Sequence, residues 1–230
     1  MAGTPERGTP TLDAPSRTRR DGAEVARASR PIPSHSSRVP RPPHPRRTRN
    51  PTTMSNTTAS PAATTLAAQL VVPSAELLLG YADQLVKTAP AETFAKMPMK
   101  DVNSAAFNIG HLAIYGDRIC SMLGREDLVT PLPFSADLFK AGAPCLDQPG
   151  LYPEKDVLVA TFFERQRRAI DAMRGAGESA LRAENPAAGR FKEMFPTVGG
   201  AVAFLLSGHV AMHLGQVSAW RRVMGLGSVG

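Results

Sequence analysis

The chain has 230 residues, of which 42% are hydrophobic, and its formal net charge is +7. This length fits one domain with an additional segment, or two small domains. The longest uncharged apolar run, residues 199–207, is far shorter than the ~20 residues that a membrane-spanning helix needs. The two cysteines have no CxxC spacing and favour a reducing compartment over a disulfide scaffold. The sequence therefore predicts a soluble, cytoplasmic protein with no membrane partner.

The positive charge is concentrated in the first quarter of the chain. Residues 1–53 contain eleven arginines, ten prolines and four acidic residues, whereas sixteen basic and sixteen acidic residues follow from Met54 onward. Because such a segment cannot bury enough apolar surface to fold, we expect residues 1–63 to be a disordered Pro/Arg-rich leader. In one interpretation translation starts at Met54, and the preceding residues are a misassigned extension. A basic arm for nucleic acid is an alternative, which the lack of stacking aromatic residues in this segment argues against.

Helical periodicity dominates the remainder of the chain, residues 64–230, and no alternating strand pattern is present. The first helix is predicted over residues 64–88, where apolar residues such as Leu70 and Leu77 recur at helical spacing. Pro73 lies inside this helix and predicts a kink or a restart. A loop with two prolines is expected to follow.

The second helix is predicted over residues 103–123, with Asp101 or Asn103 as its N-cap and Gly124 at its end. Residues 125–153 contain five prolines and two glycines. Such a composition indicates a long irregular connection rather than a further helix.

The third helix is expected over residues 153–173, because proline is favoured at a first helical position. A short helix and a loop occupy residues 178–196, and the fourth helix covers residues 197–224, before Gly225. Four helices without strands predict an all-α four-helix bundle over residues 64–230. The length of the connection between the second and third helices predicts a crossover.

Every histidine outside the leader lies in the second or the fourth predicted helix. A residue advances about 100° along a helix, which places His209 and His213 on one inward stripe and one turn apart. His111 falls on the inward stripe of the second helix. The stripe of the fourth helix comprises Val202, Leu205, His209, His213, Gln216 and Trp220, whereas Arg221 and Arg222 are predicted to point away.

Three inward imidazoles from two packed helices are typical ligands of a divalent metal. Burial of the three rings is costly unless each has a partner, and neutral imidazole is the commonest protein ligand of metals. Three protein ligands leave a coordination position open, which distinguishes a catalytic site from a structural one. His111, His209 and His213 are therefore the predicted metal ligands, and zinc, nickel, iron and manganese all accept imidazole.

Polar residues near these stripes are weaker candidates for the site. Gln216 lies one turn beyond His213 and could bind substrate or orient a ligand, or could simply pack between helices. Arg118 could bind a substrate carboxylate or extend to solvent at the end of the bundle, and Tyr115 could donate a proton or fill the core. Gln166 lies at an inward position of the third helix.

No general base is identifiable in the sequence. The HxxxH pair lacks the glutamate of HExxH, and Asp117 is predicted to be solvated.

The chain from Leu66 to Leu226 resembles the DinB/YfiT-like superfamily of metal-binding four-helix bundles. Its most specific feature is the segment His-x-x-x-His-x-Gly-Gln near the C-terminus, together with an earlier Gly-His-Leu helix. Further matches are the Arg-Arg-x-x-Gly ending and the segment that leads into the third helix. The residues of these motifs are His111, His209, His213, Gly215, Gln216, Arg221 to Gly225 and Phe139 to Pro153.

The resemblance implies a bundle with a crossover, a divalent metal on the three histidines and a homodimer. It also implies a small-molecule substrate, because members of the family include hydrolases and transferases that use thiols such as bacillithiol, mycothiol or glutathione. We therefore expect a metal-dependent thiol transferase or hydrolase, with zinc or nickel as the first candidates and a low-molecular-weight thiol as a possible second cofactor. The alternatives are a non-catalytic metal-binding bundle and a nucleic-acid-associated protein that acts through its basic leader.

Overall fold

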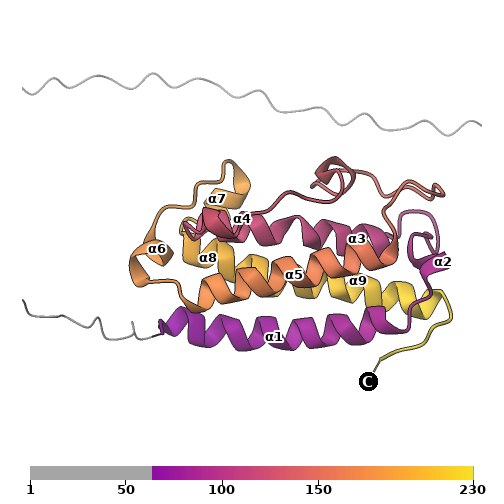
Figure 1. Ribbon diagram of the computed structural model, residues 1–230, viewed down its shortest axis with the longest axis horizontal. Helices are drawn as coiled ribbons and strands as arrows, with labels where there is room; N and C mark the ends of the chain where they lie inside the picture. Colours follow the sequence, from indigo (N-terminus) through magenta and orange to yellow (C-terminus); the bar gives the residue numbers. More distant parts are fainter. Residues whose placement is uncertain (1–63, 230) are drawn as a thin grey trace, which may run out of the picture. The chain divides into compact units, whose positions relative to one another are not determined.

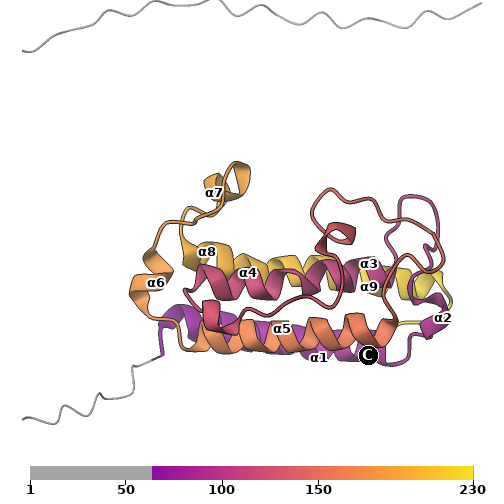
Figure 2. The same ribbon diagram turned by 45° about the horizontal axis from the view of Figure 1, so that its top comes forward.

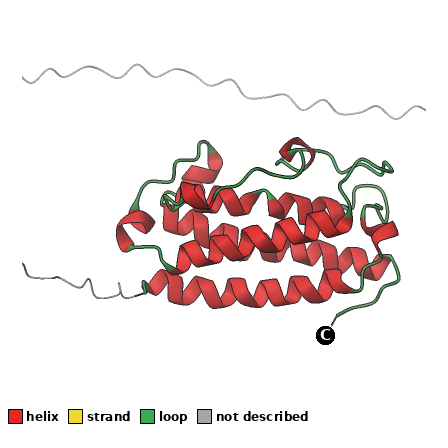
Figure 3. Ribbon diagram, in the orientation of Figure 1, coloured by secondary structure: helices red, strands yellow, loops and turns green. Residues whose placement is uncertain are grey.

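A computed structural model describes residues 64–229 of the chain. The expectations for residues 1–63, namely disorder and a start at Met54, lie outside this range. The described part is helical and contains no strand (Figures 1 and 3). The all-α fold class predicted from periodicity is therefore confirmed.

Four long helical segments lie side by side, and two of them are interrupted (Figures 1 and 2). Shorter helices and turns lie in the connections between them. The long segments are α1 (Leu66–Lys87), α3 (Ala105–Ala113) with α4 (Tyr115–Met122), α5 (Lys155–Arg174), and α8 (Val198–Ala203) with the π-helical turn η3 (Phe204–Gly208) and α9 (His209–Val223). The short elements are α2 (Ala91–Phe94), η1 (Glu126–Leu128), η2 (Ala136–Leu138), α6 (Glu178–Arg182) and α7 (Arg190–Met194).

The connection between α4 and α5 is a crossover. It runs along the length of the bundle from the end of α4 back to the end where α3 begins (Figure 1). As a result α3–α4 and α5 lie next to each other and run in the same direction, and Leu158 shares a hydrophobic cluster with α3 whereas Met173 shares one with α4. The long crossover expected from residues 125–153 is thus confirmed. The connection is ordered in two places by the single turns η1 and η2.

The interior consists of two hydrophobic clusters, one toward each end of the bundle. One cluster contains Leu85, Leu158 and Trp220, and the other contains Val72, Met173 and Val202. Along the fourth segment, buried Leu206 belongs to one cluster and buried Val210 to the other. His209 lies between these two residues, so the histidines lie near the middle of the bundle.

The first helix differs from its predicted amphipathic pattern. Leu70 and Leu77 are 65% and 75% exposed, and the buried face is formed mainly by alanine and valine such as Ala75 and Val72. Small side chains let α1 pack closely against α5 and α9. The helix also continues through Pro73 without a restart, because this proline is exposed and the carbonyl that loses its hydrogen bond can reach water.

The second predicted helix is interrupted at Ile114, which separates α3 from α4. The side chain of Gln166, on α5, donates a hydrogen bond to the backbone oxygen of Leu112 at 3.1 Å, which satisfies a carbonyl beside the interruption.

The N-cap of α3 is Ser104 rather than Asp101 or Asn103. The Ser104 hydroxyl accepts a hydrogen bond from the backbone N–H of Phe107 at 3.2 Å. The first turn of α3 is thereby anchored one residue later than predicted.

The fourth segment begins as predicted, with Thr197 as its N-cap. By length and composition the continuous helix Val198–Val223 could cross a membrane, but it packs against α1 and α3 in the bundle and contains buried Val202 and Trp220.

Arg221 was predicted to point away from the interior of the bundle, and this prediction is wrong. Arg221 is buried, and it donates hydrogen bonds to the backbone oxygen of Leu85 at 2.7 Å and to Thr88 at 3.0 Å. It therefore satisfies acceptors at the C-terminus of α1.

Asp117 is not solvated as predicted but forms an ion pair with Arg165 of α5, whose side chain is 2% exposed. Arg165 also donates to the backbone oxygens of Thr130 and Pro131 at 2.8 and 2.9 Å. Gly116 makes this approach possible, because a Cβ atom there would lie only 2.7 Å from the Arg165 backbone oxygen. This buried cluster fastens the crossover to α4 and α5.

Candidate metal centre

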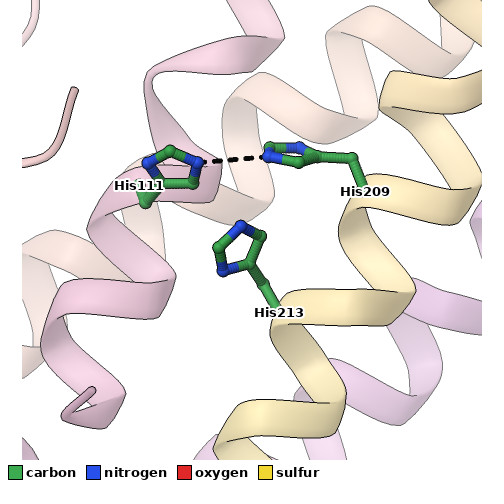
Figure 4. Close-up of side chains that lie close together, drawn as sticks. All are labelled: His111, His209 and His213. Carbon is green, nitrogen blue, oxygen red and sulfur yellow. Dashed lines mark hydrogen bonds between the residues drawn. The ribbon is translucent and has the colours of Figure 1, made fainter. Parts of the chain in front are cut away.

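The structure brings His111, His209 and His213 together between α3 and α9 (Figure 4). The potential ligand atoms of the three side chains all lie within 4.8 Å of one another. His111 Nε2 and His209 Nε2 are 3.1 Å apart, within hydrogen-bond distance. The predicted convergence of the three imidazoles is therefore confirmed.

His111 is oriented by the crossover connection. Its Nδ1 donates a hydrogen bond to the backbone oxygen of Phe139 at 2.6 Å. A carbonyl can only accept, so this bond places the proton on Nδ1 and leaves the lone pair of Nε2 directed toward the other imidazoles. The preceding Gly110 lets the connection approach, since a Cβ atom there would lie 2.3 Å from the ring of Phe139.

His213 is oriented by Asn108, a residue that the sequence analysis did not identify. The Nδ1 atom of His213 lies 2.8 Å from Asn108 Oδ1, so it donates a proton there and presents Nε2 as the free acceptor. Asn108 is itself buried, and its Nδ2 donates to the backbone oxygen of Ser104 at 3.0 Å. Its position one turn before His111, in an otherwise apolar stretch, was the signal available in the sequence.

His209 is the first residue of α9 and follows the π-helical turn directly. Such turns occur often at functional sites, because the additional residue shifts the side chains that follow. His209 Nδ1 is buried and has no hydrogen-bond partner among the described residues. Gly208 before it is close to the ring of Phe204, which would lie 3.1 Å from an added Cβ atom.

The electrostatic environment keeps all three imidazoles neutral. Burial lowers the pKa of His111, although the bond to Phe139 opposes this effect. Burial, then the neighbouring His213 and His111, lower the pKa of His209 to about 3. Burial and His111 lower the pKa of His213 to about 4. Neutral imidazoles with two Nε2 lone pairs held toward a common point are suited to bind a divalent metal.

The structure places the other candidate residues differently. The ring of Tyr115 lies 4.9 Å from that of His111 and 4.6 Å from that of His209, so it borders the centre directly. Arg118 is exposed and lies over this tyrosine ring. Gln166 is bonded to the backbone of α3, as described above. Gln216 is exposed rather than inward, and its Oε1 accepts a hydrogen bond from Asn103 at 3.2 Å.

The fold and the site together define an all-α protein with a three-histidine group suited to a metal. The sequence model of the DinB superfamily matches residues 75–217. Since this match covers more than half of the chain and includes all three histidines, the protein belongs to the DinB superfamily. Searches among curated proteins and among solved structures give no match.

Proposed function

We propose that this protein binds a divalent metal through His111, His209 and His213 and is a cytoplasmic, metal-dependent thiol transferase or hydrolase. The observation that carries the proposal is the convergence of three neutral imidazoles within 4.8 Å of one another. The group contains no fourth protein ligand within the described residues. A position therefore stays open for a small-molecule substrate.

The residues around the imidazoles support this assignment. Phe139 and Asn108 hold the Nδ1 protons of two ligands, which fixes their ring orientation and increases the basicity of Nε2. A divalent metal in such a centre can lower the pKa of a bound water or deprotonate a bound thiol. Tyr115 is in ring contact with two of the histidines, which supports a role as the donor of a hydrogen bond to a substrate. Imidazole ligands favour zinc or nickel first, with iron or manganese as alternatives.

Elemental analysis of the purified protein tests the metal assignment. We expect stoichiometric metal in the natural protein and a loss of most of it in His213→Ala, which removes one of three ligands. Met212→Ala is the matched control, because Met212 precedes His213 on the same helix and its side chain is 61% exposed. Equal metal content in the natural protein and His213→Ala would contradict the proposal.

A non-catalytic metal-binding bundle is the second candidate function. It is favoured by the composition of the histidine group, which contains no carboxylate within the described residues and so supplies no obvious general base. Thiol-transfer and esterase assays of metal-loaded protein distinguish the two functions. Turnover that disappears in His213→Ala supports the enzyme, whereas stoichiometric metal without turnover across the panel supports the second candidate.

We further propose that the protein is a homodimer, because the resemblance to the DinB/YfiT-like superfamily implies homodimerisation. Light scattering of the purified chain gives the mass directly. A mass of one chain across a wide range of protein concentrations would contradict this assignment.

A further inference from the structure

Arg118 carries a positive charge beside the proposed metal centre, and no group of the described residues neutralises it. The side chain is exposed, and its Cζ lies 5.9 Å from the centre of the Tyr115 ring and 5.5 Å from that of Phe191. Within residues 64–229 it makes no hydrogen bond and no ion pair. By contrast, Arg125, seven residues further along the chain, is paired with Asp127. The guanidinium group is therefore held by two aromatic faces while its N–H donors stay available.

Tyr115 connects this guanidinium to the proposed metal ligands. Its ring lies within 4.9 Å of the His111 ring and 4.6 Å of the His209 ring, and the guanidinium of Arg118 lies over the same ring. Side chains of a helix lean toward its N-terminus, so Arg118 on α4 leans back toward Tyr115 and the preceding His111. The guanidinium and the imidazoles of His111 and His209 are therefore neighbours of one and the same tyrosine ring.

Aromatic rings border the same region from a different part of the chain. Phe204, in η3, lies 6.0 Å from the His209 ring, and Phe195 is stacked on Phe204 at 4.7 Å. Phe191, on α7, continues this row at 5.2 Å from Phe195 and contacts Arg118. All three phenylalanines are only partly buried. Figures 1 and 2 show α7 above the end of the bundle that α4 and α8 form.

We propose that Arg118 is the anion-binding residue of this site and that the substrate carries a carboxylate group. In this arrangement the carboxylate pairs with the guanidinium of Arg118, and an apolar or aromatic body lies against Tyr115 and Phe191. The reacting end of the molecule then reaches the three histidines. The planar donor fork of arginine matches a carboxylate, and stacking on two rings keeps that fork oriented. The inference rests on the proposed function, because it assigns a substrate class to the same centre.

Binding of two thiols to the cobalt(II)-loaded protein tests this assignment without an activity assay. The probes are mercaptohexanoate and mercaptohexanol, unbranched molecules with the thiol at one end and a carboxylate or a hydroxyl group at the other. The thiolate-to-cobalt absorption band reports binding of each. We expect the natural protein to bind the acid about tenfold more tightly than the alcohol, the effect of a charged pair at a partly exposed site.

Substitutions of two different arginines separate the role of Arg118 from a general effect of charge. Arg118→Gln is expected to abolish the preference for the acid, and Arg118→Lys to retain part of it. Arg167→Gln is the matched control, because Arg167 is also exposed and lies over an aromatic ring, that of Phe163, at 5.1 Å on α5. This control is expected to keep the full preference.

The outcomes distinguish this inference from the metal assignment. If cobalt produces no absorption with the natural protein, the metal assignment fails and the inference fails with it. If cobalt binds but the acid and the alcohol bind equally, or if Arg118→Gln keeps the preference, only the assignment of Arg118 is overturned. Loss of the preference in Arg118→Gln but not in Arg167→Gln supports it.

Discussion

The side chains of Asn108 and His213, which are 105 positions apart in the sequence, form a hydrogen bond of 2.8 Å between α3 and α9. Asn108 is fully buried, and a second hydrogen bond ties its amide nitrogen to the backbone of Ser104 at the start of α3. The orientation of one proposed metal ligand therefore depends on the N-terminal turn of the helix that carries another, His111.

Removal of this hydrogen bond is expected to weaken metal binding without removing a ligand. In Asn108→Leu the Nδ1 proton of His213 has no acceptor, so the ring loses its fixed orientation. We expect the zinc dissociation constant, measured by competition with a chelator, to rise about 10- to 100-fold. Asn103→Leu is the control, because Asn103 bonds the exposed Gln216 instead. A folded Asn108→Leu variant with unchanged zinc affinity would argue against this role.

The contact of Gly110 with Phe139 predicts a combined effect on stability and on the metal centre. In Gly110→Ala the new methyl group would overlap the ring of Phe139, which has to move together with the carbonyl that orients His111. We expect a loss of about 1–3 kcal/mol in the free energy of unfolding, as for other overpacked sites, and weaker zinc binding. Denaturant unfolding of the metal-free protein measures the first effect.

Gly80→Ala is the matched control for that substitution. Gly80 also lies within a helix, but nothing in the described structure comes within 4 Å of an added Cβ atom. Because alanine restricts the unfolded chain more than glycine does, we expect a stabilisation of about 0.4–1 kcal/mol. A similar loss in both variants would show that the clash with Phe139 is not the cause.

The buried ion pair between Asp117 and Arg165 is expected to stabilise the attachment of the crossover. Asp117→Ala leaves the buried guanidinium of Arg165 without its carboxylate, and such losses typically cost about 3–5 kcal/mol. Asp137→Ala removes an exposed partner of Lys140 instead, with an expected effect below about 1 kcal/mol. Thermal unfolding compares the two variants, and equal midpoints would refute the distinction.

The lowered pKa values of the histidines predict that the metal-free protein loses stability in acid. The pKa is about 3 for folded His209 and about 4 for folded His213, against 6.5 in the unfolded chain. Below pH 6.5 the unfolded chain therefore binds more protons than the folded chain, and stability falls as the pH falls toward 4. Above pH 6.5 these groups contribute no further change.

Thermal midpoints of chelator-treated protein between pH 7.5 and pH 4 measure this dependence. The variant His213→Gln removes one of the buried titrating groups, so its midpoint is expected to fall less steeply with pH than that of the natural protein. An identical slope in the two proteins would show that His213 does not contribute to the acid sensitivity.

Periodicity alone predicted the four helical segments, because amphipathic helices repeat their buried positions every three or four residues whatever their neighbours are. It also predicted that His111, His209 and His213 face inward. The same reasoning misplaced Leu70, Leu77 and Gln216, since several faces of a helix can carry apolar or polar residues and packing decides which is buried. The small residues of α1 and the π-helical turn before His209 changed which faces of these two helical segments are buried.

The sequence by itself determined the all-α fold class and the inward faces on which the three histidines lie, since both follow from local spacing along single helices. Only the tertiary structure decided that Phe139 and Asn108 orient those rings, that Asp117 is paired with Arg165, and that Arg118 lies over Phe191. Each of these contacts joins residues of different segments. Its existence depends on how the crossover and the helices pack, a property that no local repeat in the chain encodes.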